Sequence, residues 1–124
     1  MRYWLFAGML VAAGLGLAAC GGRFSPPSGT TPPSQVIEVV AKEWAFEPAT
    51  ITVRAGRLIF RVKNDGVVEH NFALEQRPGA EVSAIKPGEA KSLAVTLGPG
   101  AYTVFCNLPG HREAGMVASV RVRE

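Results

Sequence analysis

From residue 36 to its end, the chain is a series of short β-prone segments separated by turn signals. The segment RLIFRVKN at 57–64 alternates apolar and polar residues, which is the period of a half-buried strand. The tripeptides NDG at 64–66 and GPG at 98–100 mark tight turns between such segments. Roughly seven or eight short strands and no helix are expected, which predicts an all-β fold, an antiparallel sandwich or barrel.

Three segments of this pattern carry specific expectations. The segment VIEVVAKEWAF at 36–46 reads as one strand, and the Glu-Pro pair that follows ends it. The segment GAEVSAIKPG at 79–88 is bounded by Gly and Pro, so we expect a loop there. In EHNFALE at 69–75, the alternation points His70 inward together with the Phe and the Leu, unless a bulge intervenes.

The hydrophobic core has few large candidates. A single small domain of this length buries one modest core. The large residues expected in it are Trp44, Phe46, Phe60, Phe72, Tyr102 and Phe105. For most of them we expect only a packing role.

The N-terminal segment MRYWLFAGMLVAAGLGLAAC has the character of an export signal. Arg2 is its only charge, and its apolar stretch is shorter than the roughly 20 residues that span a bilayer as a helix. We predict a signal peptide at residues 1–19 and lipidation of Cys20, because Leu-Ala-Ala-Cys resembles the bacterial lipobox. An ordinary cleaved signal and an uncleaved N-terminal anchor are the alternatives.

Residues 20–35 are rich in Gly, Ser, Thr and Pro and carry one charge. Such a composition cannot bury a core, so we expect a disordered segment whose Pro pairs stiffen parts of it. This segment would tether a folded domain at residues 36–124 to a lipid on Cys20. The expected location is extracytoplasmic, either periplasmic or at the cell surface, on a membrane.

Three potential metal ligands lie in one short stretch, FCNLPGHREAGM. Four residues separate Cys106 from His111, and four separate His111 from Met116. His70 is the only other histidine, and the remaining Cys and Met residues all lie within residues 1–20. Two His, one Cys and a distant Met form the ligand set of a blue-copper centre, because thiolate, imidazole and thioether are ligands that copper prefers.

The same scarcity of ligands excludes several other kinds of site. A centre with three histidines cannot be built from two, a binuclear copper centre needs two bridging cysteines, and a disulfide within the domain needs a second cysteine. Zinc held by Cys and His is an alternative metal, but it leaves Met116 without a role. The net charge is only +3 and the basic residues are scattered, so we expect no nucleic-acid partner.

These residues resemble those of the cupredoxins, the small blue-copper proteins that include plastocyanin, azurin, auracyanin and rusticyanin. The resemblance spans residues 36–124 and rests on EHNF, on GPGAYTVFC and on the loop CNLPGHREAGM. The loop, with four residues on each side of its His, is most similar to that of auracyanin and rusticyanin. The resemblance implies a Greek-key β-sandwich and one type 1 copper ion bound by His70, Cys106, His111 and Met116.

The resemblance also implies a role for each residue near the copper. Cys106 would bind as a thiolate, the two imidazoles would complete a trigonal plane, and Met116 would be the weak axial ligand. Asn71 would tie the two ligand segments together by hydrogen bonds near the thiolate. The backbone carbonyl of Glu69 is a candidate for a further ligand on the side opposite Met116.

The ring edge of His111 would be the port for electrons. An apolar docking patch around this port would comprise Val67, Val68, Leu108 and Pro109. Ordinary packing within the loops is the alternative interpretation of these four residues.

The leading hypothesis is a membrane-tethered electron carrier, not an enzyme, that moves single electrons between extracytoplasmic redox partners. A cytochrome, an oxidase or a reductase is the kind of partner expected, and we expect the carrier to be monomeric. The alternative is a copper-binding or copper-delivery protein without redox turnover, which exposed Met-rich or His-rich stretches would favour. A fragment of an enzyme such as a nitrite reductase would need further His ligands.

Overall fold

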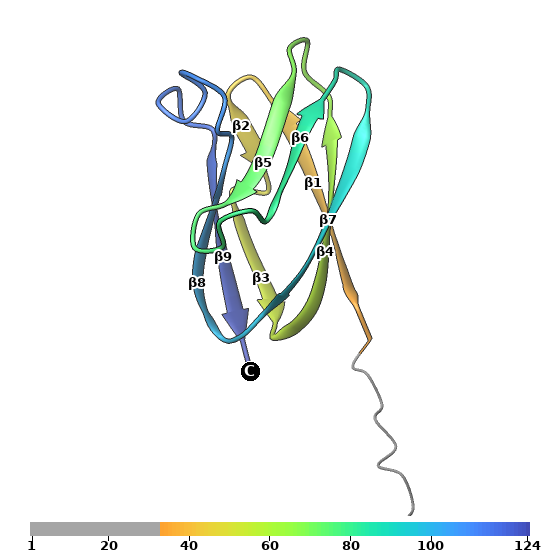
Figure 1. Cartoon of the computed structure of the whole chain (residues 1–124), viewed down its shortest axis with the longest axis vertical. Helices are drawn as coiled ribbons and strands as arrows, with labels where there is room; N and C mark the ends of the chain where they lie inside the picture. The colour runs from red at the N-terminus through yellow and green to blue at the C-terminus, as the bar shows by residue number, and fades with distance from the viewer. Residues whose placement is uncertain (1–32) are drawn as a thin grey trace, which may run out of the picture.

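The computed structural model describes residues 33–124, which form a sandwich of two β-sheets (Figure 1). One sheet has the strand order β2-β1-β4-β7, and the other has the order β3-β9-β8-β5-β6. The strands are β1 (Gln35–Lys42), β2 (Ala45–Glu47), β3 (Thr50–Arg54), β4 (Gly56–Asn64), β5 (His70–Leu74), β6 (Glu81–Ile85), β7 (Ala90–Leu97), β8 (Gly100–Phe105) and β9 (Val117–Arg123). The predicted all-β fold class is confirmed.

The predicted signal peptide, Cys20 and most of the predicted tether lie outside the described residues. The first strand begins at Gln35, one residue before the predicted start of the domain. The Gln35 side chain exchanges hydrogen bonds of 2.9 and 3.0 Å with the backbone of Arg54, which joins this strand to β3 of the other sheet. Over residues 33–124 there is no helix long and apolar enough to cross a membrane.

Both sheets are mixed, whereas purely antiparallel pairing was expected. β1 pairs in parallel with β4, and β3 pairs in parallel with β9, while the other pairs are antiparallel. The parallel pairs arise because the chain changes sheet between β2 and β3 and again between β3 and β4, so these partners are not hairpin neighbours. The segment 36–46 forms two strands, because Glu43 and Trp44 make a turn between β1 and β2.

The expectation of a loop at residues 79–88 was wrong, because the segment contains β6. This strand lies at the edge of its sheet and pairs only with β5. Its regular alternation is broken at Ala84, which has a positive φ of 54°. The flanking Gly and Pro residues led to the expectation of a loop. The pairing of β5 with β6 also shifts register between His70 and Phe72. All five residues of β5 are buried.

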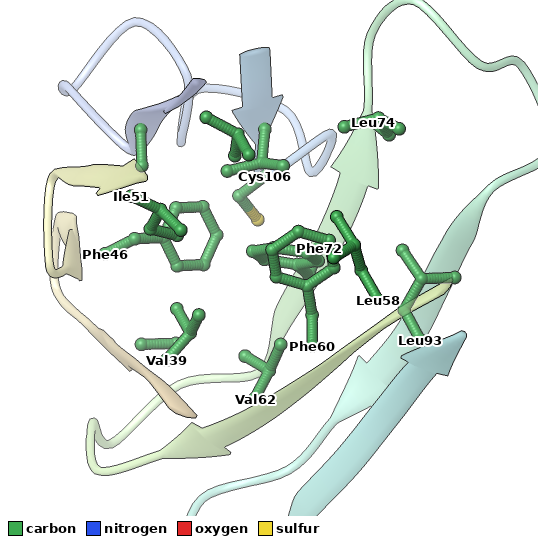
Figure 2. Packing of buried hydrophobic residues seen from close by; sticks show 14 of the residues in the cluster. Val39, Phe46, Ile51, Leu58, Phe60, Val62, Phe72, Leu74, Leu93 and Cys106 are labelled. Atoms are coloured by element: carbon green, nitrogen blue, oxygen red, sulfur yellow. The ribbon is translucent and has the colours of Figure 1, made fainter. Parts of the chain in front are cut away.

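The core lies between the two sheets and is built around three phenylalanines (Figure 2). The rings of Phe46 and Phe72 pack edge to face with centroids 5.3 Å apart, and Phe60 lies 5.4 Å from Phe72. These three predicted core residues are at most 1% exposed. Such aromatic pairs add to the stabilisation that comes from burial of their apolar area.

The other three aromatic residues predicted for the core are not fully buried, although Tyr102 packs against the core. Trp44 is 43% exposed, and Tyr102 and Phe105 are half-buried. Tyr102 donates a hydrogen bond of 3.0 Å from its hydroxyl to the carbonyl of Gly98. The guanidinium of Arg112 lies over the Phe105 ring, 4.5 Å from its centroid. A pattern of apolar residues in the sequence does not show which rings use a polar group or stay partly exposed.

The core extends directly to the cysteine and the methionine of the predicted site. Cys106 and Met116 are both 0% exposed and belong to the same apolar cluster. In Figure 2 the sulfur of Cys106 points into the interior, towards the region of Phe46 and Phe72. The connection between β8 and β9 that carries these residues lies at the end of the sandwich opposite the C-terminus (Figure 1).

Candidate metal centre

Three ligand atoms, from the start of β5 and from the loop between β8 and β9, meet at this end of the sandwich. His70 is the first residue of β5, Cys106 directly follows β8, and His111 lies in the ligand loop, which we define as residues 106–116. β5 and β8 are antiparallel neighbours, so the start of one lies beside the end of the other. The Nδ1 atoms of His70 and His111 are 3.4 Å apart, and Cys106 Sγ is 3.4 Å from His111 Nδ1. All three atoms lie within 4.8 Å of one another.

This spacing fits one small metal ion. Bonds of about 2.0 to 2.3 Å, the lengths that zinc makes to imidazole and thiolate, would place three ligand atoms of a trigonal plane about 3.5 to 3.8 Å apart. The combination of two imidazoles and one thiolate with a thioether is the donor set of a blue-copper site. Met116, the expected axial ligand, is fully buried where the ligand loop ends. The residues present therefore fit a type 1 copper ion.

Backbone hydrogen bonds close the ligand loop. Cys106 donates its N–H to the carbonyl of Met116 at 3.1 Å, and Met116 donates to the carbonyl of His111 at 3.1 Å. A further bond of 3.1 Å runs from the N–H of His111 to the carbonyl of Leu108. Gly110 has a φ of 82°, in the region that favours glycine, so the Pro-Gly pair shapes this turn. The loop holds its three potential ligands in place through its own backbone.

Asn71 connects the two segments that carry the ligands. Its backbone N–H donates to Cys106 Sγ at 3.3 Å, and its side-chain Nδ2 donates to Oδ1 of Asn107 at 2.7 Å. Its Oδ1 accepts the N–H of Ala84 at 2.8 Å, which adds β6 to the same network. An N–H donor to a thiolate sulfur stabilises its negative charge and fixes its position.

Asn64, which sequence reasoning missed, organises the connection between β4 and β5. The side chain is fully buried, and its Nδ2 donates to the carbonyls of Val68 at 2.7 Å and Ile85 at 2.8 Å. Its Oδ1 accepts the N–H of Gly66 at 2.8 Å. The turn signal NDG could be read from the sequence, but these hydrogen bonds could not. They fix the segment that leads directly into His70.

Glu43 contacts the outer nitrogen of the first histidine. Its Oε1 lies 3.1 Å from His70 Nε2 and accepts the backbone N–H groups of Val67 at 2.9 Å and Val68 at 3.1 Å. A Cβ on Gly66 would collide with this carboxylate, so the glycine leaves room for it. No local pattern links Glu43 to a histidine 27 residues later, and sequence reasoning missed it.

Trp44 packs against both histidine rings. Its ring lies edge to face on His111 with centroids 4.7 Å apart, and the His70 ring is 6.4 Å away. The sequence prediction placed this residue in the core, but it covers the site from the turn between β1 and β2. Its indole therefore forms part of the wall between the two histidines and solvent.

The electrostatics favour a neutral His70. Burial lowers the pKa of His70, and the hydrogen bond and charge of Glu43 oppose this effect. The N–H of Val68 holds the pKa of the Glu43 carboxyl below its usual value against desolvation, with help from Val67 and His70. In neutral imidazole one ring nitrogen carries the proton and the other is free to bind a metal, and the Glu43 carboxylate lies beside Nε2.

The predicted docking patch comprises Val67, Val68, Leu108 and Pro109. Val67 is 83% exposed and Val68 is 37% exposed, and Pro109 is also exposed. Leu108 is half-buried and packs against the core. His111 is half-buried. Exposed apolar side chains therefore occur in both segments that lead to the histidines.

Comparison with known proteins identifies the family. The family model of the Cupredoxin-like domain matches residues 10–118, most of the chain. The chain belongs to the cupredoxin family. The copper-resistant cuproprotein CopI of Rubrivivax gelatinosus is 31% identical over 121 residues, which cover 81% of this cupredoxin and 73% of the relative. CopI of Pseudomonas aeruginosa is 25% identical, and the match covers 85% of each chain.

Solved auracyanin structures share the fold of this cupredoxin. Auracyanin B aligns with a TM-score of 0.65 and 22% identity, over 73% of this chain and 89% of its own. Auracyanin A, a "blue" copper protein from Chloroflexus aurantiacus, aligns with a TM-score of 0.64 and 23% identity, over 73% and 100%. The family and the donor set together assign copper as the cofactor. The predicted cupredoxin fold and its metal are thus confirmed.

Proposed function

We propose that this cupredoxin is a one-electron carrier, not an enzyme, that acts outside the cytoplasm and is held at a membrane by a lipid on Cys20. One observation carries the proposal. The ligand atoms of His70, Cys106 and His111 already lie within 4.8 Å of one another, in a frame held by hydrogen bonds. A site held by the fold accommodates both oxidation states with little rearrangement, which rapid electron transfer requires.

When bound, copper supplies a centre that alternates between Cu(II) and Cu(I). Cys106, His70, His111 and Met116 would hold this copper ion. The protein limits the access of water to the site, since the side chains of Cys106, His70 and Met116 are fully buried. Asn71 donates its N–H to the thiolate and keeps it in one position.

The half-buried ring of His111 would pass electrons to and from partners. The docking patch of Val67, Val68, Leu108 and Pro109, extended by Trp44, would give a partner an apolar surface beside this ring. Such a patch suits brief contacts with a cytochrome, an oxidase or a reductase. The predicted export signal and the predicted tether at residues 20–35 would place the domain outside the cytoplasm, where it would reach its partners along the membrane as a monomer.

The names of the two CopI relatives favour a second candidate function. A copper-resistance protein could bind or deliver copper without redox turnover. The burial of His70 and Cys106 argues against delivery, because an acceptor must reach the ligands to exchange the metal.

A copper titration of the full-length chain in detergent tests the carrier proposal. We expect an intense visible thiolate-to-copper band and narrow copper hyperfine splitting in the EPR spectrum. Cys106→Ser should lose the band, whereas Cys20→Ser should keep it, because only Cys106 lies at the site. A colourless Cu(II) adduct of the folded wild-type protein would contradict the proposal.

A second measurement separates the carrier from a delivery protein. The Cu(I) form is mixed either with an oxidised cytochrome or with an excess of a strong Cu(I) chelator. A carrier reduces the cytochrome much faster than it loses copper to the chelator. A delivery protein shows the reverse order.

A further inference from the structure

We propose that Glu43 is a positioning residue of the copper site: its carboxylate keeps the proton of His70 on Nε2, directs Nδ1 towards the metal and lowers the reduction potential of the copper. The tuning of the potential rests on the proposed function, and the positioning of the ring does not.

The contacts of Glu43 restrict the orientation of the His70 ring. One oxygen, Oε1, accepts the N–H groups of Val67 and Val68 and lies 3.1 Å from His70 Nε2. The Glu43 side chain is 25% exposed and that of His70 is 0% exposed, so water competes little for this contact. With Nε2 engaged, the only free ring nitrogen is Nδ1, which faces the other two ligand atoms.

The charge of Glu43 distinguishes it from a neutral hydrogen-bond acceptor. A hydrogen bond to a carboxylate is charge-assisted and therefore stronger than one to a carbonyl. A carboxylate on the outer nitrogen of a ligating histidine makes the ring a better electron donor. Cu(II) carries one more positive charge than Cu(I), so this donation and the nearby negative charge stabilise the oxidised form more. The reduction potential is lowered as a result.

A purely structural role for Glu43 is the competing explanation. The same carboxylate joins the turn between β1 and β2 to the segment at Val67 and Val68, and this alone could stabilise the fold. Glu43→Gln separates the two roles, because the amide oxygen can still accept the three N–H groups but carries no charge. A structural role therefore predicts no change in potential for this variant.

The first test measures the reduction potential of the copper-loaded full-length chain. In Glu43→Gln we expect the type 1 band to remain and the preference for Cu(II) over Cu(I) to fall about tenfold, a rise of about 59 mV for a one-electron couple. The matched control is Glu47→Gln, which removes the same charge from an exposed carboxylate of β2 that pairs with Lys42. Equal shifts in the two variants, or no shift in either, would overturn the tuning role.

The second test uses nitrogen NMR of the copper-free protein at a pH where His70 is neutral. We expect the Nε2–H form of the His70 ring in the wild type, and a clear population of the Nδ1–H form in Glu43→Ala. An Nδ1–H ring in the wild type, or an unchanged ring in Glu43→Ala, would overturn the positioning role. If Glu43→Ala does not fold, weakening of the Nε2–H preference in Glu43→Gln decides the same point.

The two tests distinguish the inference from the function that it partly rests on. A wild-type protein without a type 1 band, but with the expected His70 ring form, would refute the electron carrier and keep Glu43 as the residue that orients the ligand. A type 1 band, with no effect of Glu43→Gln on the potential and no effect of Glu43→Ala on the ring, would keep the electron carrier and refute the role of Glu43.

Discussion

Trp44 lies close enough to His111 to report on the metal. The two rings are 4.7 Å apart, and a redox-active Cu(II) ion on the imidazole quenches an indole at such a distance by electron or energy transfer. We expect Cu(II) to quench the emission of Trp44 in a titration of the full-length chain. In the unprocessed chain, Trp44→Phe leaves Trp4 as the only tryptophan, so this variant should lose most of the quenching. Equal fractional quenching in both proteins would contradict the contact.

The residues at the site differ in how far sequence alone could predict them. The cluster of His70, Cys106 and His111 was predictable, because these residue types are rare in the chain and occur together in the order and spacing of a blue-copper site. Asn71 was predicted because the resemblance to cupredoxins implies a polar residue that ties the ligand segments together directly after His70. Glu43 and Asn64 were not, because Glu and Asn are common at surfaces and turns. Their partners His70 and Ile85 lie 27 and 21 residues away, and only the packing of the strands brings them together.

The connection between β4 and β5 depends on the buried side chain of Asn64. In Asn64→Ala the carbonyls of Val68 and Ile85 lose their donor, and the N–H of Gly66 loses its acceptor. Buried groups left without partners cost about 1–3 kcal/mol each before relaxation, so we expect a loss of at least about 2 kcal/mol in the free energy of unfolding. Urea denaturation of the copper-free protein measures this loss.

Asp65→Ala is the matched control in the same turn. Its carboxylate makes an exposed ion pair of 2.7 Å with Lys63, and such pairs contribute about 0–1 kcal/mol. If the two alanine variants lose equal stability, the buried hydrogen bonds of Asn64 do not organise this connection.

Strands that follow from their local sequence pattern could be predicted, and strands that depend on long-range contacts could not. β4 could be predicted because it alternates along its length and is buried on one face. The split of the segment 36–46 into β1 and β2 could not, because the turn at Glu43 and Trp44 is stabilised by contacts with residues of the site. β6 was missed because its place at the edge of the sheet depends on pairing with β5, not on its own composition.

The stability of the whole copper-free domain should fall as the pH is lowered. Burial lowers the pKa of His70 below the ordinary 6.5, so near that pH the unfolded chain binds a proton that the folded chain does not. Stability rises with pH wherever the unfolded state binds more protons. The contribution of the neutral ring is therefore present above about pH 6.5 and is lost as the pH falls below it. The carboxyl of Glu43, with a pKa below the ordinary 4.5, adds a second loss at lower pH.

Urea unfolding of the copper-free protein between about pH 7.5 and 5 tests this dependence on His70. We expect the midpoint to fall over this range in the wild type and to change less in His70→Gln, whose side chain cannot take up the proton. An equal decline in both would assign the effect to other groups. Because copper binds only where Nδ1 is unprotonated, the loaded protein should keep its midpoint to lower pH than the copper-free protein. The difference between the midpoints of the copper-loaded and the copper-free protein, followed over pH, measures how far folding and copper binding depend on the same neutral His70.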